Sequence, residues 1–276
     1  MPEASSASTT ARGYSDWPFF LCLGLIGGVY ILLIVAMLLA DASFTSPKHL
    51  WQALQSPEIR YSIKLSLLSC SLTALMSVWV AVPIGYLLSR YQFRGRALLD
   101  AILDIPIVLP PLVIGLSLLI LFESPLGKSV QKWFPVTYEI PSVILAQFSV
   151  ACAFAVRTMR ATFDQINPRQ EQVALTLGCR RSQAFWMVVF PEARRGLLTA
   201  ATLAWARALG EFGPILIFSG ATRMRTEVLP TSVFLELSVG NIEAAVAVSL
   251  LMVIVAVLVL VVIRVYGVEK TLGRPL

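Results

Sequence analysis

The sequence is poor in charge and in histidine, and each shortage excludes a class of protein. Only 14% of its 276 residues are charged, while 57% are hydrophobic, whereas soluble domains carry about a quarter charged residues. The bilayer is therefore the expected solvent, and most globular enzymes are excluded. A single histidine, His49, excludes a histidine-based catalytic centre and a multi-histidine metal site.

Cysteine and nucleotide-binding glycine loops are also scarce. The four cysteines are scattered, without zinc-site spacing or disulfide density, so we interpret them as small buried hydrophobes. No Walker-type glycine loop occurs, so any nucleotide chemistry must belong to another chain. We therefore expect no catalytic residue, metal ion or cofactor here.

Long apolar stretches are what the sequence does contain. A membrane-crossing helix needs about 20 predominantly apolar residues, and this predicts an all-α, polytopic membrane protein with six transmembrane helices, near 18–40, 62–88, 101–122, 140–163, 197–220 and 242–266. We expect a disordered cytoplasmic tail (1–16), a first helix with an outer loop (17–59), a core (60–266) containing a cytoplasmic loop (164–196), and a C-terminal tail (267–276).

The basic residues indicate the orientation of these spans. With an even number of spans both termini lie on one side, together with the cluster Arg90, Arg94 and Arg96 and most of the other Lys and Arg. The positive-inside rule makes that side cytoplasmic. The net charge of +6 could also suggest a nucleic acid, but topology explains it and we expect no such partner.

The cytoplasmic loop carries the signals of a bent pair of helices. Asn167 is a typical N-cap, Pro168 suits the first helical position, Gln170 would complete a capping box, and Gly178 suits the C-terminal turn. A second helix is expected from Ser182 to a break at Pro191. The loop is thus predicted to be a helix-turn-helix outside the membrane plane.

This loop resembles the coupling segment of permease subunits of bacterial binding-protein-dependent ABC importers, the MetI-like superfamily. Their signature is Glu-Ala-Ala, three residues, Gly, nine residues, then Ile-x-Leu-Pro. The spacing is complete here, with Gly178 followed by Val188 to Pro191, whereas Gln172 replaces the glutamate and Glu171 precedes it. The resemblance implies a docking helix for an ATPase subunit, with contacts from Glu171, Gln172, Val173, Ala174, Leu177, Gly178, Arg180 and Arg181. An amphipathic helix lying on anionic lipid is the alternative.

Two spans contain residues that disturb a membrane helix. In the third, Pro110 and Pro111 remove backbone donors, which favours a kinked, pore-lining helix or a kink used for packing. In the fifth, Arg207 and Glu211 are one turn apart, either on the transport path or paired with each other. Gly210 adds a point of weakness, and Ser117 is a hydroxyl available to an anion. These six are the candidate path or gate residues.

The run "RALGEFG" in the fifth span resembles permeases for tetrahedral oxyanions. The resemblance implies transport of molybdate or tungstate, with sulfate or thiosulfate next. It also implies two ABC ATPase subunits that bind ATP and Mg²⁺, a second permease copy, an external substrate-binding protein and a bacterial plasma membrane. The alternatives are a permease for an unrelated small solute, an ATPase-independent channel and a membrane-embedded enzyme, the last disfavoured by the missing histidines and clustered carboxylates.

Overall fold

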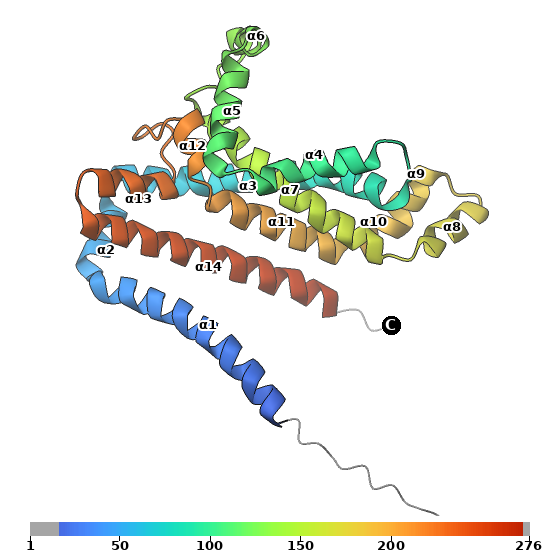
Figure 1. The fold of residues 1–276 in the computed structure, drawn as a ribbon, viewed down its shortest axis with the longest axis horizontal. Helices are drawn as coiled ribbons and strands as arrows, with labels where there is room; N and C mark the ends of the chain where they lie inside the picture. The colour runs from blue at the N-terminus through green and yellow to red at the C-terminus, as the bar shows by residue number, and fades with distance from the viewer. Residues whose placement is uncertain (1–16, 273–276) are drawn as a thin grey trace, which may run out of the picture. The chain divides into compact units, whose positions relative to one another are not determined.

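The computed structural model describes the backbone of residues 17–272 and the side chains of residues 17–263, except those of Pro18 and Pro47. Every regular element within this range is a helix (Figure 1), which confirms the predicted all-α fold. The predicted tail at 1–16 and the last four residues of the tail at 267–276 lie outside the described residues. The elements are α1 (Trp17–Phe44), α2 (Pro47–Gln55), α3 (Pro57–Arg90), α4 (Arg96–Val108), α5 (Pro111–Glu123), α6 (Pro125–Trp133), α7 (Ile140–Gln165), α8 (Pro168–Thr176), α9 (Arg181–Ala184), the π-helix η1 (Phe185–Val189), α10 (Phe190–Glu192), α11 (Arg194–Leu209), α12 (Gly213–Phe218), α13 (Leu229–Ser238) and α14 (Ile242–Leu272).

The chain divides into two compact units at Ser46 and Pro47. The first contains α1, a helix of 28 residues with no charged residue before Asp41. A helix that is apolar all round needs an apolar environment on every side. The second unit begins with α2, which packs against α3 and α14, and it contains both regions that bear on function.

The core of the second unit is formed by α3, α7 and α11, which pack against one another. A stripe of small hydroxyl side chains on α3 is buried in it, and small residues let helix backbones approach closely. At Gly85 an added Cβ would lie 2.9 Å from the backbone nitrogen of Arg160 on α7. The buried stripe consists of Ser62, Ser66, Ser69, Thr73 and Ser77.

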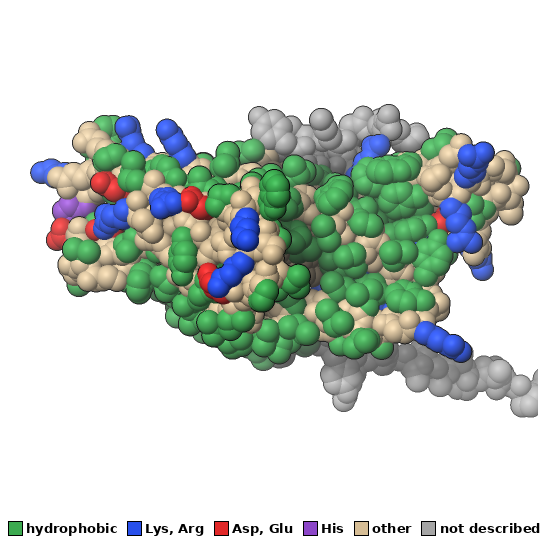
Figure 2. Space-filling view, turned by 90° about the horizontal axis from the view of Figure 1, so that it is seen from above, with side chains coloured by type: hydrophobic (Ala, Val, Ile, Leu, Met, Phe, Trp, Pro, Cys, Tyr) green, Lys and Arg blue, Asp and Glu red, His purple; other side chains and the backbone are tan. Residues whose placement is uncertain are grey.

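Four of the six predicted spans are single helices. α1, α3, α7 and α14 are each long and apolar enough to cross a membrane. Figure 2 shows Lys and Arg side chains over the left half and towards the right end of the face in view, with a stretch of hydrophobic side chains between the two groups. This distribution is typical of helices that cross a bilayer.

The other two predicted spans are interrupted. The stretch 101–122 becomes α4 and α5, which meet at an angle of 111°. Pro110 and Pro111 have no backbone N–H, so the helical hydrogen-bond ladder cannot continue through them. The stretch 197–220 becomes α11 and α12, with Gly210, Glu211 and Phe212 outside both helices.

The second halves of the interrupted spans pack together. α5 leaves the direction of α4 and carries α6 at its far end (Figure 1). An added Cβ on Gly115 of α5 would lie 2.7 Å from Cα of Pro214, and one on Gly213 of α12 would lie 3.1 Å from the nitrogen of Leu112. The absence of side chains at Gly115 and Gly213 therefore allows this contact.

Candidate coupling segment and transport path

The helix α8 has the predicted caps at both ends. The Asn167 side chain accepts a hydrogen bond from the Arg169 N–H at 3.0 Å, and Pro168 is the first helical residue. At the other end Gly178 has φ +91°, and the N–H of Cys179 donates to the carbonyl of Ala174 at 3.1 Å. Glycine adopts this left-handed conformation without the steric cost of a Cβ. The predicted capping box is wrong, because Asn167 binds the N–H of Arg169 rather than that of Gln170.

The second helix of the segment differs from the prediction at its end. It begins at Arg181, where the side chain of Gln183 accepts from the Arg180 N–H at 2.8 Å. It does not break at Pro191, because η1 precedes the proline and the N–H of Phe190 donates five residues back to Phe185. The wider π-turn accommodates the proline ring, and the helix is interrupted only at Ala193, before α11.

Most of the predicted ATPase-contacting residues are exposed. Val173 and Leu177 are 56% and 80% exposed, and Gln172, Gly178, Arg180 and Arg181 are exposed as well. Ala174 is buried, so the predicted apolar ridge presents only Val173 and Leu177 to a partner. Such exposed apolar side chains on a capped helix form a suitable docking face.

Glu171 points the other way, into its own chain. Its carboxylate accepts from the Tyr86 hydroxyl at 2.5 Å and lies 3.5 Å from Nε of Arg90, with the side chains of Arg90 and Glu171 only 9% and 12% exposed. Arg90 also donates to the carbonyl of Ile166 at 2.9 Å. Neither Tyr86 nor Arg90 was predicted to contact Glu171, because no local sequence pattern links the end of α3 to a loop about eighty positions later.

Arg207 and Glu211, in the predicted fifth span, form an ion pair. Nη1 of Arg207 lies 2.5 Å from Oε1 of Glu211, and the two side chains are 29% and 1% exposed. The guanidinium carbon of Arg207 lies 5.6 Å from the ring centre of Phe154. The pair sits where α11 ends, next to Gly210.

The structure brings most of the candidate path residues together. Gly213, two residues after Glu211, contacts Pro111 and Leu112 at the start of α5, so the two helix breaks are neighbours. Ser117 lies further along α5 and is exposed. Broken membrane helices of this kind are found where backbone groups line a cavity or are buried in protein.

Two ion pairs between α4 and α7 were not predicted. Asp100 pairs with Arg160, and Asp104 pairs with Arg157 through two hydrogen bonds. The count of basic residues placed Arg157 and Arg160 on the cytoplasmic side, although the predicted span 140–163 contains both. They lie within α7, and the aspartates of α4, four residues apart on one helix face, supply their counter-charges.

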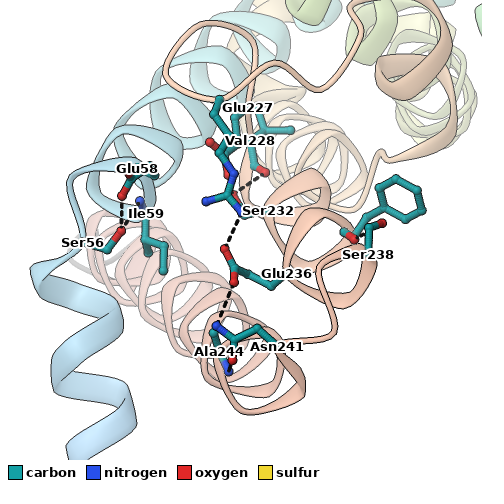
Figure 3. Close-up of polar contacts among 12 residues, drawn as sticks. Ser56, Glu58, Ile59, Glu227, Val228, Ser232, Glu236, Ser238, Asn241 and Ala244 are labelled. Atoms are coloured by element: carbon teal, nitrogen blue, oxygen red, sulfur yellow. Dashed lines mark hydrogen bonds and ion pairs between the residues drawn. The ribbon is translucent and has the colours of Figure 1, made fainter.

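A polar cluster occupies the opposite end of the second unit. Glu236 accepts from Arg223 at 2.8 Å and from Asn241 at 3.1 Å, and Glu227 accepts from Ser232 at 2.8 Å. Figure 3 shows the Glu236 carboxylate directed towards Asn241. Burial raises the pKa of the Glu227 carboxyl, against the lowering effect of Ser232. The cluster stabilises the connection between α12 and α14.

Known proteins match this chain over most of its length. The family described as binding-protein-dependent transport system inner membrane component matches residues 81–268, a range that includes both helix breaks and the whole coupling segment. The sulfate transport system permease protein CysT of Escherichia coli (strain K12) is 31% identical over 233 residues, which cover 83% of this chain and 82% of CysT. The molybdate/tungstate transport system permease protein WtpB of Pyrococcus abyssi (strain GE5 / Orsay) is 33% identical over 198 residues, which cover 72% of this chain and 75% of WtpB.

A solved structure shares the fold. A chain of a bacterial alginate ABC transporter, crystallised in complex with an alginate pentasaccharide-bound periplasmic protein, matches with a TM-score of 0.71 and 17% identity, covering 90% of this chain and 93% of that chain. Identity this low supports the fold alone. Because the family match spans more than half of the sequence and includes the coupling segment, the chain belongs to the binding-protein-dependent transport system inner membrane components, the membrane-spanning permease subunits of ABC importers.

Proposed function

We propose that the chain forms the transport path of an importer for a tetrahedral oxyanion, and that α8 seats in a groove on a separate ATPase subunit. The observation that carries the proposal is the exposed apolar tip of α8, with Val173 and Leu177 turned away from the chain's own core. Helix-in-groove contacts use apolar anchors of this kind. ATP and Mg²⁺ bind the ATPase subunit, and this chain performs no covalent chemistry.

The working assembly contains two permease copies, two ATPase subunits and an external substrate-binding protein in a bacterial plasma membrane. Both termini and α8 face the cytoplasm, as the positive-inside rule indicates. The periplasmic protein in the alginate complex supports a binding-protein partner, and no nucleic acid is involved. Closure of the ATPase pair moves the two coupling segments and opens the path alternately to either side.

The neighbouring helix breaks form the gate of this path. Pro110, Pro111 and Gly210 free backbone groups at membrane depth, which require protein or a water-filled cavity around them. Arg207 is the partly exposed member of its ion pair with Glu211, so its guanidinium can still donate to an anion, and Ser117 supplies a hydroxyl further along α5. Displacement of α5 and α12 as one block would open or close the path.

The coupling role is tested by changing one exposed anchor. We expect Leu177→Asp to reduce the recovery of ATPase subunits with the tagged permease, because a carboxylate would be buried in the groove at high cost. Leu126→Asp is the matched control, since Leu126 on α6 is also 80% exposed but lies outside the coupling segment. Gly178→Pro should also abolish uptake, because proline cannot adopt the φ of +91° found there. Full ATPase recovery with Leu177→Asp, together with unchanged uptake by Gly178→Pro, would contradict the proposal and favour an ATPase-independent channel.

The substrate class requires a separate measurement. The relatives include permeases named for sulfate and for molybdate or tungstate, and we propose molybdate or tungstate first, with sulfate or thiosulfate next. Tracer uptake of molybdate and of sulfate should be compared in cells with and without this chain. Loss of one uptake activity identifies the anion, whereas full uptake of both anions without the chain would contradict the oxyanion assignment.

A further inference from the structure

Glu171 is the one acidic residue of α8, and its side chain points away from the docking face formed by Val173 and Leu177. Val173 and Leu177 are exposed for a partner, but the Glu171 carboxylate is held between the Tyr86 hydroxyl and the Arg90 guanidinium. The side chains of Arg90 and Glu171 are largely buried between α8 and the end of α3, and that of Tyr86 is partly buried. A carboxylate that accepts one hydrogen bond and faces a guanidinium as counter-charge fixes the position of the helix that carries it.

Tyr86 and Arg90 are themselves held in place. The ring of Tyr86 packs edge-on against Phe163 and Phe185, with ring centres 5.6 and 4.9 Å away. Arg90 is bound to the carbonyl of Ile166 at 2.9 Å. The preceding turn of α3 is in backbone contact with α7 at Gly85. The two groups that meet Glu171 are therefore preorganised by the core.

The other end of α3 is bound to the segment between α12 and α13. The Tyr61 hydroxyl donates to the carbonyl of Arg225 at 2.9 Å. The hydroxyl of Ser66 accepts from the N–H of Leu229 at 2.8 Å, and Leu229 is the first residue of α13. One continuous helix thus carries side-chain contacts to α8 at one end and to the segment between α12 and α13 at the other.

We propose that Glu171, Tyr86 and Arg90 form a latch that locks α8 to α3, so that α3 carries the displacement of the docked segment to the outer end of the permease. The inference rests on the proposed docking of α8. Tyr86 and Arg90 are positioning residues that touch neither the ATPase subunit nor the transported anion. Without the latch, α8 can move with its partner while α3 stays behind, so ATP hydrolysis continues without productive transport.

The test measures coupling rather than activity. Permease, ATPase subunits and binding protein are reconstituted in proteoliposomes, and the number of anions imported per ATP hydrolysed is determined. Tyr86→Phe keeps the packed ring and removes only the donor. A hydrogen bond to a charged group is strong enough to shift a two-state equilibrium by roughly tenfold, so we expect about a tenfold lower ratio with normal recovery of ATPase subunits. Tyr138→Phe, a hydroxyl deletion at a half-exposed residue between α6 and α7, should leave the ratio unchanged.

A second variant separates the latch from a folding defect. Glu171→Gln keeps the shape and can still accept from Tyr86 but loses the charge that Arg90 faces, so its ratio should fall as well. The double variant should lose little more than Tyr86→Phe alone, because both changes open the same latch. Unchanged ratios in Tyr86→Phe and Glu171→Gln would overturn the inference. If Leu177→Asp still reduced ATPase recovery in that case, only the latch would be wrong; if it did not, the docking of α8 would be wrong too.

Discussion

Arg207 and Glu211 are unequal partners. The side chain of Glu211 is almost completely buried, while that of Arg207 keeps about a third of its surface exposed and lies over the ring of Phe154. Removing one partner of a buried ion pair leaves the other charge without compensation. The loss of stability therefore depends on whether Arg207 or Glu211 is replaced.

We expect Arg207→Leu to lower the free energy of unfolding by about 3–5 kcal/mol, because the Glu211 carboxylate stays buried without its counter-charge. Glu211→Gln should cost clearly less, since Arg207 still reaches solvent and the aromatic ring. The double change Arg207→Leu with Glu211→Leu should recover much of the loss. The variants are purified in detergent and heated, and size-exclusion chromatography then measures how much folded protein remains. Equal losses of stability for Arg207→Leu and Glu211→Gln would contradict this prediction.

Glu227, which lies outside the predicted spans, makes the stability of the fold depend on pH. Burial raises its pKa above the ordinary value of 4.5, so the folded state favours the protonated carboxyl. The stabilisation that Glu227 contributes is therefore complete at pH values below its pKa in the unfolded chain. It is lost as the pH rises through its pKa in the folded protein. Glu227→Gln retains an acceptor for Ser232 and removes this loss. We expect its unfolding midpoint to exceed that of the parent at pH 8 and to converge towards it near pH 4.5; a constant difference at both pH values would contradict the assignment.

Among the elements, the pair α5 and α12 has its tightest glycine contact at Gly115. A methyl group on Gly115 would lie 2.7 Å from Cα of Pro214, a backbone atom that cannot move aside cheaply. We expect Gly115→Ala to separate the two half-helices and to reduce uptake at least several-fold, while ATPase recovery stays normal because α8 is remote in the chain. Val113→Ile on the same helix also adds one carbon, at an exposed position, and should transport normally. Equal uptake by both variants would show that the close contact is not needed.

Elements defined by local chemistry were predicted well. The ends of α8 follow from Asn167, Pro168 and Gly178, whose effects act within one turn of helix. The interruption of the third span follows from two prolines. What could not be predicted is that the third and fifth spans break side by side, or that Glu171 turns inward, because both depend on contacts between residues far apart in the sequence. Helical periodicity gives a buried face but not the partner that covers it.

For the whole molecule, the orientation in the membrane is open to direct measurement. In a variant whose four cysteines are replaced, a single cysteine is introduced by Lys128→Cys or by Arg180→Cys, both at exposed positions. We expect a membrane-impermeant maleimide to label the first in intact cells and the second only after permeabilisation. The reverse pattern would place α8 on the outer side and exclude contact with a cytoplasmic ATPase.

The distribution of basic residues could be predicted from the sequence only in part. Counting Lys and Arg predicted a sided membrane protein without any knowledge of the fold. The count used Arg157 and Arg160 as orienting charges of the cytoplasmic side, whereas both lie in α7 and pair with the aspartates of α4. A basic residue near the end of a span can orient the protein in the membrane or form an ion pair with another helix. Only the packing of α4 on α7 shows that these two arginines form ion pairs.

The contact between α5 and α12 also has a consequence for biosynthesis. The ribosome releases Pro110, Pro111 and α5 long before it synthesises Gly213 and Pro214, so during that interval the half-helix has no partner for its glycine face. Unpaired carbonyls in lipid are costly, which favours retention of this stretch beside the insertion machinery until the fifth span arrives. A chain truncated before Gly213 should accordingly be degraded quickly, whereas one that continues through α12 should leave the insertion site and persist.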